Sequence, residues 1–213
     1  SGQTSLFYLE AQAVVGYSSS LSKWVYYSLR PDDAMQKPSL GFDYVQRFAR
    51  ETGDFAMLAF QARLAWSEDA KKLELQLYNA YLKLKFPGVD FWAGHSRPAV
   101  GLSSVFDIHS QVLPTLAMYG YGYDRDWGVG LGRDFSDGSW GVSITTGAGM
   151  PLRLGKSYLF SGRLSFGVLA RDNWSVGLSG AYGEALETMG YTIMSSDPKA
   201  FRLAGVDITR VWN

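Results

Sequence analysis

The stretch LSFGVLARDNWSVGLSGAY, residues 164–182, decides the fold class, because large and small residues alternate along it. Apolar or aromatic side chains recur at every second position, and Ser, Gly or Ala stands at most of the positions between them. This period of two is typical of β-strands, in which successive side chains point to opposite faces. The polar Arg171-Asp172-Asn173 between the two halves predicts a tight connection between antiparallel strands.

The same alternation predicts ten strands along the chain. In the fourth of them the apolar phase changes near Asn79, which predicts a β-bulge at that residue. The expected strands cover residues 5–17, 39–50, 55–67, 73–86, 89–96, 125–135, 139–150, 157–170, 173–183 and 200–212.

The connections between these strands alternate strictly between long and short. The tight ones are 51–54, 86–88, 136–138 and 171–173, and the stretch 136–138 ends in Asp-Gly, a strong hairpin signal. In an antiparallel meander this order places every tight turn at one end, as in outer-membrane β-barrels. We therefore expect an all-β fold, an antiparallel transmembrane β-barrel that forms one domain over residues 1–213. The ten visible strands would make a small barrel or a part of a larger one, with long loops at 18–38, 96–122 and 184–198.

A barrel in lipid turns its large apolar side chains outward and its small or polar side chains toward the lumen. We expect lipid contact at Leu58, Phe60, Val142, Ile144, Phe166, Val176 and Leu178. The expected lumen residues include Ser143, Thr145, Gly147, Ser161, Arg163, Ser165, Ser175 and Ser179. Aromatic residues near strand ends predict a girdle at the headgroups: Tyr17, Trp66, Trp127, Trp140, Tyr158, Trp174 and Tyr182. The alternative is a soluble β-sandwich or lipocalin-like barrel, but the uncharged run 138–152 argues against a solvated surface.

The composition narrows the classes of protein further. Aromatic residues make up 15% of the 213 residues, which is unlike a disordered chain. No Cys is present, which excludes a disulfide scaffold and a thiolate metal site. The 20 basic and 20 acidic residues balance, so nothing predicts a nucleic-acid partner. We expect no cofactor and no bound metal.

Two segments resemble a known family. The first is LQLYNAYLKLKFPGVDFWAGHSRPAVGL, residues 75–102, and the second is FRLAGVDITRVW, residues 201–212. Their short motifs resemble outer-membrane porins of the phosphate-selective porin O/P type. The matching residues are Ala80-Tyr81, Pro87-Gly88, Gly94, Pro98, Gly101-Leu102, Gly205 and Asp207. The resemblance implies a channel with an inward-folded loop and about sixteen or more strands, so the ten strands of this chain depart from the family pattern.

The resulting prediction is a channel in the bacterial outer membrane for passive diffusion of small hydrophilic solutes. Charges inside a barrel act as selectivity devices, and here four strand positions are basic and two acidic, which favours anions. An alternative is that these charges pair with one another across the barrel. The expected pore-lining residues are Glu10, Arg63, Lys83, Lys85, Arg97, Arg163 and Asp207. Loop 96–122 carries an apolar, uncharged stretch from Val112 to Tyr123, which predicts that it folds into the pore, forms an extra helix or contacts a neighbouring protomer.

Two other functions fit the pattern. A barrel with many small inward residues serves equally well as a sheath or anchor for a partner protein. An outer-membrane lipid-modifying enzyme would need a His and a Ser that meet in space. Both histidines, His95 and His109, are followed directly by Ser, but neighbours on a strand point to opposite faces. We therefore expect no enzyme and no catalytic residues.

The expected partners are outer-membrane lipid, small solutes, and either a second copy of the chain or a partner protein. Both termini should lie on the periplasmic side and the long loops on the extracellular side.

Overall fold

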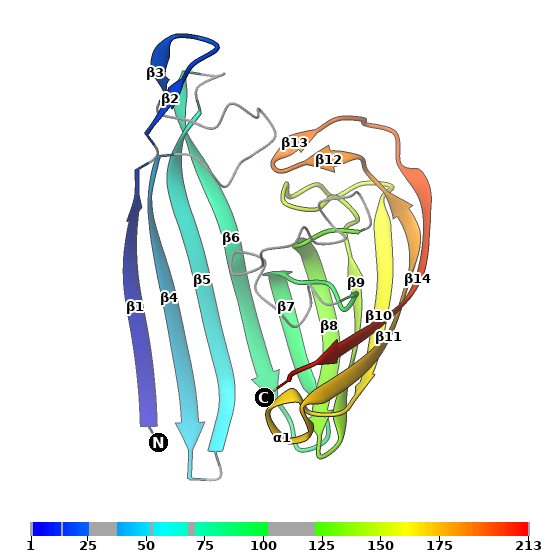
Figure 1. The fold of residues 1–213 in the computed structure, drawn as a ribbon. Helices are drawn as coiled ribbons and strands as arrows, with labels where there is room; N and C mark the ends of the chain where they lie inside the picture. The colour runs from blue at the N-terminus through cyan, green and yellow to red at the C-terminus, as the bar shows by residue number, and fades with distance from the viewer. Residues whose placement is uncertain are drawn as a thin grey trace. The chain divides into compact units, whose positions relative to one another are not determined.

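A computed structural model describes residues 2–13, 15–25, 38–51, 53–67, 71–101 and 122–212. The predicted all-β class is confirmed, and the ten predicted strands form one sheet in which neighbours along the order pair (Figure 1). The order is β1-β4-β5-β6-β7-β8-β9-β10-β11-β14. These strands are β1 (Gly2–Gln12), β4 (Ser39–Arg50), β5 (Gly53–Ser67), β6 (Lys72–Lys85), β7 (Asp90–Ser96), β8 (Asp126–Phe135), β9 (Gly138–Thr145), β10 (Tyr158–Phe166), β11 (Trp174–Ala185) and β14 (Lys199–Arg210).

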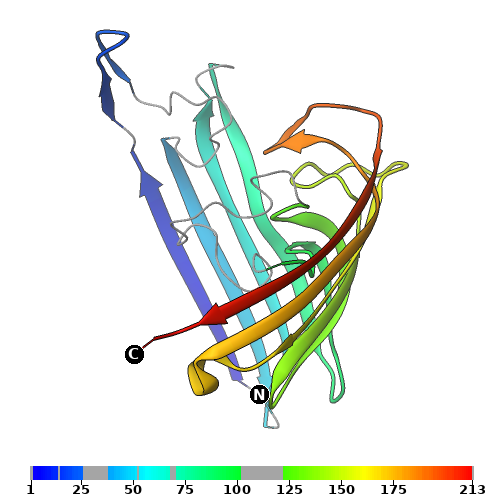
Figure 2. The same cartoon turned by 45° about the vertical axis from the view of Figure 1, so that its right-hand side comes forward.

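The chain divides into two compact units, and the division falls within β6. Unit 1 covers Ser1–Ala80 and unit 2 covers Tyr81–Asn213. In unit 1, β1 pairs with β4 and β4 with β5, in both cases antiparallel. In unit 2, the antiparallel pairs run from β7 through β8, β9, β10 and β11 to β14 (Figure 2). No helix in the described residues has the length and hydrophobicity needed to cross a bilayer.

Three strands end at least four residues earlier than predicted. The first stops at Gln12 instead of residue 17, because Tyr17 belongs to a separate hairpin of β2 (Gly16–Ser18) and β3 (Lys23–Val25). β9 stops at Thr145 instead of residue 150, where Gly147 and Gly149 both adopt positive φ. β10 stops at Phe166 instead of residue 170, because Gly167 has φ +84° and the chain then enters α1 (Leu169–Asp172).

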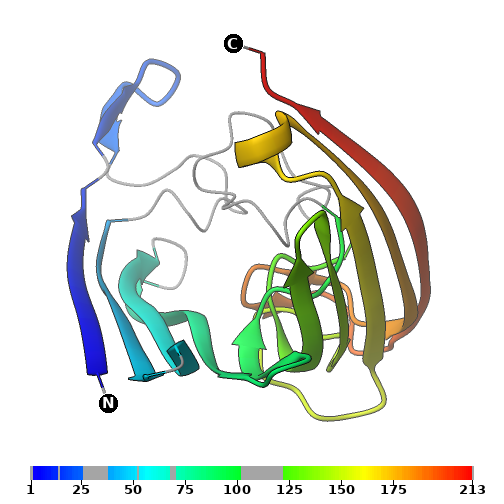
Figure 3. The same cartoon turned by 90° about the horizontal axis from the view of Figure 1, so that it is seen from below.

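The predicted loop 184–198 contains a second small hairpin, β12 (Thr188–Met189) with β13 (Thr192–Ile193). The short connection between β10 and β11 is a single helical turn, α1, rather than a three-residue turn. Figure 3, which looks at the structure from below, shows this turn at one end of β11. A second departure is the connection between β5 and β6, residues 68–71, which is as short as residues 86–89 between β6 and β7; the other connections alternate in length as predicted.

The change of phase in β6 is confirmed by side-chain contacts in unit 1. Arg63 Nε donates to Gln76 Oε1 at 2.8 Å, and Asn79 Nδ2 donates to Gln61 Oε1 at 2.7 Å. Gln61 and Arg63 are two residues apart on β5, so they share a face. Gln76 and Asn79 are three apart and nevertheless reach that same face, so β6 switches phase between them.

Candidate functional site

The strands of unit 2 have two chemically distinct faces. The polar side chains lie on the face where side chains are buried, and the apolar side chains lie on the exposed face. In β10, Ser161, Arg163 and Ser165 are buried, whereas Phe160 and Leu164 between them are exposed. The registers extend this division across four strands. The polar face carries Ser139, Ser143, Thr145, Ser161, Arg163, Ser165, Ser179 and Asp207. The apolar face carries Val142, Ile144, Phe160, Leu164, Leu178, Tyr182, Val206 and Ile208.

An ion pair crosses strand β11 on the polar face. Arg163 on β10 and Asp207 on β14 are joined by two hydrogen bonds, with Nη2 to Oδ1 at 2.7 Å and Nε to Oδ2 at 3.3 Å. Their side chains are only 7% and 13% exposed. Gly177 lies beneath them on β11, where a Cβ would come 2.3 Å from Arg163 Nη2. A side chain at this position would displace the guanidinium and the carboxylate from where they meet.

A hollow of about 430 Å³ lies beside this ion pair. Three of the predicted pore-lining residues, Lys83, Arg97 and Arg163, line it together with the carboxylates of Asp90 and Asp134. Lys83 Nζ lies 2.7 Å from Asp90 Oδ2. Lys83 therefore has an acidic partner, as Arg163 has. Other lining residues are Tyr81, Trp92, Ser96, Ala99, Ser139 and Trp140.

The beginning of the long 96–122 connection lies across the polar face. We call residues 98–101 the strap. The strap's backbone is held by serines of the sheet: the N–H of Ala99 donates to Ser143 Oγ at 3.2 Å, and that of Gly101 to Ser179 Oγ at 3.0 Å. Between them Val100 is 3% exposed and belongs to the cluster with Leu159 and Ala181. The strap thus lies against the polar face, and residues 102–121, which make up most of the predicted loop, lie outside the described part of the chain.

A buried carboxylate, that of Asp126, accepts several hydrogen bonds where β8 begins and β9 ends. Asp126 is fully buried and accepts hydrogen bonds from Thr146 Oγ1 at 2.7 Å and from the N–H groups of Gly147 and Gly149 at 2.8 and 3.1 Å. Tyr123 Oη donates to the carbonyl of Gly147, and burial raises the pKa of this phenol. This cluster is structural, and the alternation of the strands did not reveal it. An acidic residue that starts a strand near a glycine-rich turn is the signal that indicates it.

The remaining predicted pore residues lie in unit 1 or away from the hollow. Arg63 bonds Gln76, and its Nη1 also lies 3.4 Å from Gln12 Oε1. Glu10 is exposed and shares the face of Gln12, two residues along β1. Lys85 is exposed at the end of β6 and is not among the residues that line the hollow.

The histidine of the enzyme alternative is a packing residue in unit 2. His95 is fully buried, and its ring centroid lies 4.9 Å from that of Trp127. His109 and Ser110 lie outside the described residues.

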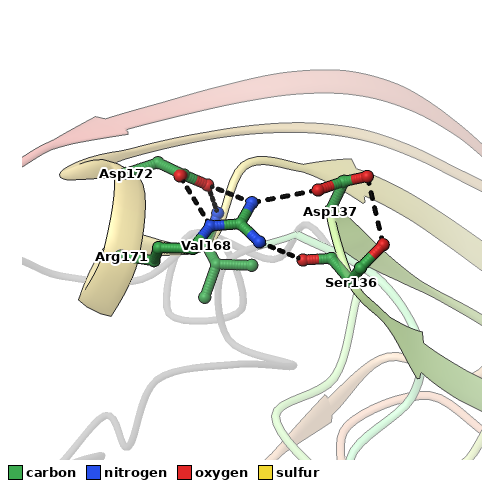
Figure 4. A network of polar contacts seen from close by, with 5 residues as sticks. All are labelled: Ser136, Asp137, Val168, Arg171 and Asp172. Carbon is green, nitrogen blue, oxygen red and sulfur yellow. Dashed lines mark hydrogen bonds and ion pairs between the residues drawn. The ribbon is translucent and has the colours of Figure 1, made fainter.

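A clamp of exposed charges ties together two neighbouring connections at the tight-turn end of unit 2 (Figure 4). Arg171 of α1 donates to the carbonyl of Ser136 at 2.8 Å and to Asp137 Oδ1 at 3.0 Å, both in the β8–β9 turn. It also donates to Asp172 Oδ1 at 2.8 Å, and this bond lowers the pKa of Asp172. The Asp172 carboxylate accepts the N–H of Val168 as well, at 2.9 Å. The clamp therefore holds the ends of two hairpins in register.

Comparison with known proteins finds no match to this chain among protein-family models, curated proteins or solved structures.

Proposed function

We propose that this chain forms an outer-membrane β-barrel that acts as a passive channel for small hydrophilic solutes. The observation that supports it most strongly is the orientation of side chains in unit 2. Strands β9, β10, β11 and β14 expose apolar side chains on one face and bury serine, threonine and an ion pair on the other. A soluble sheet has the reverse arrangement, whereas a sheet with lipid on its outer side has this one.

The size of the exposed apolar surface supports the same proposal. Val206 is 67% exposed, Ile208 72% and Leu178 51%, and these side chains are neighbours in the register of β11 and β14. Soluble monomers rarely expose large contiguous apolar patches, because apolar surface in water is unfavourable. Acyl chains of a bilayer would cover this surface. Strands of 9 to 12 residues, as in β8, β10, β11 and β14, suit a tilted crossing of the hydrocarbon.

The polar face carries the hydroxyl and charged side chains that an aqueous channel needs along its wall. The hollow beside Arg163 carries both signs of charge, and the backbone of the strap is hydrogen-bonded to serines of this face. Because Lys83 and Arg163 each have a carboxylate partner, we infer a weaker preference for anions than the unpaired charges would give. The proposed route needs no cofactor and no energy source.

Thiol blocking in a planar bilayer tests the channel directly, because the chain has no Cys of its own. Ser139 lines the hollow on the polar face, so Ser139→Cys should conduct and then lose current when a bulky thiol reagent is added. Val142→Cys is the matched control on the apolar face, and its current should persist after the same treatment.

Two results would contradict the proposal. One is a chain that stays monomeric in water without detergent and never conducts. The other is equal blocking of the Ser139→Cys and Val142→Cys variants. Purification only as a stoichiometric complex, without conductance, would support the sheath or anchor instead.

A further inference from the structure

The apolar face of unit 2 contains a hollow of about 800 Å³ that the channel does not use. Its floor includes Gly162 on β10 and Gly180 on β11, which pair directly with each other. Ala204 on β14 continues this row of small residues. Larger side chains flank the row on both sides along the strands, with Phe160 and Tyr182 on one side and Leu164 and Leu178 on the other.

The backbone does not require glycine at either position. Neither Gly162 nor Gly180 has a positive φ, and the register of β10 with β11 runs without a bulge. A Cβ would meet its nearest neighbour at 3.6 Å in both cases, which is ordinary van der Waals contact. Glycines on the polar face differ, since a Cβ on Gly130 or Gly177 would come within 2.3 Å of another side chain. Glycine weakens a strand interior, and where no bend or bulge needs it, it often marks close approach of a ligand or of another backbone.

A cation lies beside this hollow. Arg202 stands opposite Tyr182 in the β11–β14 register, and its Cζ lies 5.8 Å from the centroid of that ring. Tyr182 itself lines the hollow. Among the described residues the Arg202 guanidinium has this ring contact but no carboxylate partner. An exposed guanidinium next to an apolar groove is complementary to a phosphate group that carries an acyl chain.

We propose that this groove binds a phosphate-bearing lipid, with one acyl chain over Gly162 and Gly180 and the phosphate at Arg202. The site rests on the proposed membrane location. It adds to the channel a defined lipid contact on the outer surface, on strands whose polar face carries the Arg163–Asp207 pair.

Native mass spectrometry of the full chain in detergent micelles tests the site, with phosphatidylglycerol as the probe and phosphatidylcholine of the same acyl chains for comparison. Gly180→Leu fills the groove and should weaken binding of both lipids. Arg202→Gln should weaken phosphatidylglycerol binding about tenfold, the effect of losing one charge-assisted hydrogen bond. Gly205→Leu is the matched control, because its Cβ meets nothing within 4 Å and the β11–β14 register places it on the polar face.

The result that overturns the lipid site is wild-type affinity for phosphatidylglycerol in both Gly180→Leu and Arg202→Gln. Gly162→Leu gives a second filled groove should Gly180→Leu fail to fold. Insertion and conductance are measured on the same samples. A wild-type chain that fails to insert contradicts the proposed channel, whereas an inserted, conducting chain with unaltered variants overturns the lipid site alone.

Discussion

The Arg163 guanidinium and the Asp207 carboxylate meet 2.7 Å apart over the bare backbone of Gly177, so the pair bridges two strands that are not neighbours. Arg163 lies on β10 and Asp207 on β14, with β11 between them. Both side chains are mostly buried on the polar face. The positive charge that would favour anions therefore has an acidic partner.

Asp207→Asn should leave Arg163 unpaired and increase anion preference. The measurement is the zero-current potential of the reconstituted channel in a salt gradient. Arg163→Gln should shift that potential toward cations, and the double variant should return close to the wild-type value. We expect each single change to cost on the order of 1–3 kcal/mol of stability, between the values for exposed and buried pairs. Equal potentials in all four proteins would contradict a role of this pair in selectivity.

Reversing the charge at Lys83 should change the ion selectivity of the channel more than reversing the charge at Lys85. Lys83 lines the hollow next to Asp90, so Lys83→Glu places two carboxylates together and should favour cations. Lys85 is exposed at the strand end, so Lys85→Glu should have a smaller effect on the zero-current potential. Leu84→Ile is the control and should leave the potential unchanged. A larger shift from Lys85→Glu than from Lys83→Glu would show that the hollow is not on the ion path.

The sequence was sufficient to predict the ten strands of the main sheet and the faces of their side chains, because both depend on local alternation. Val142, Ile144 and Leu178 are exposed and Ser143, Ser161 and Ser165 buried, as the period of two requires. The phase change near Asn79 was visible for the same reason. The ends of β9 and β10 could not be predicted from alternation, because they depend on the hydrogen bonds of Asp126 and on the backbone conformation at Gly167.

Contacts between distant residues could not be predicted in this way. Alternation placed Arg163 and Asp207 on one face, but only the registers of β10 and β14 with β11 show that they pair. The bond from Gly101 to Ser179 spans 78 residues, and no local pattern connects them. The Lys83–Asp90 pair lies across a tight turn, so a hairpin register could have suggested it.

Arginine substitutions distinguish the two faces of unit 2. Leu178→Arg on the apolar face should cost about 2–4 kcal/mol in the free energy of unfolding from lipid, if it lies near the midplane. Gly205→Arg should cost far less, because that position lies on the polar face and a Cβ there meets nothing within 4 Å. Ser143 and Ser165 suit this test poorly, since both are buried and hydrogen-bonded. Equal costs at Leu178 and Gly205 would mean that the faces are wrongly assigned.

The clamp at the tight-turn end predicts a pH dependence of stability. The hydrogen bond from Arg171 lowers the pKa of Asp172 in the folded chain, so the ionised carboxylate stabilises the fold. That contribution is present above the ordinary Asp pKa of about 3.9 and is lost as pH falls through the lowered value. Asp172→Asn should therefore reduce stability at neutral pH, and the difference from wild type should disappear in acid. Asp197→Asn, at an exposed acid outside the clamp, should show no such convergence in urea unfolding curves.

The strap gives the last prediction, which concerns the width of the channel. Val100 is 3% exposed and packs against Leu159 and Ala181, and the two serine bonds hold only the backbone on either side of it. Val100→Ala should remove about 1–2 kcal/mol of packing and loosen the strap from the polar face. A loosened strap should leave single-channel conductance higher or noisier than in the wild type, because the space above the serines is no longer held at one width. Val206→Ala makes the same change on the apolar face, where the side chain is 67% exposed, and should leave conductance as it was. Identical conductance and noise in Val100→Ala and Val206→Ala would show that the strap does not narrow the route taken by solutes.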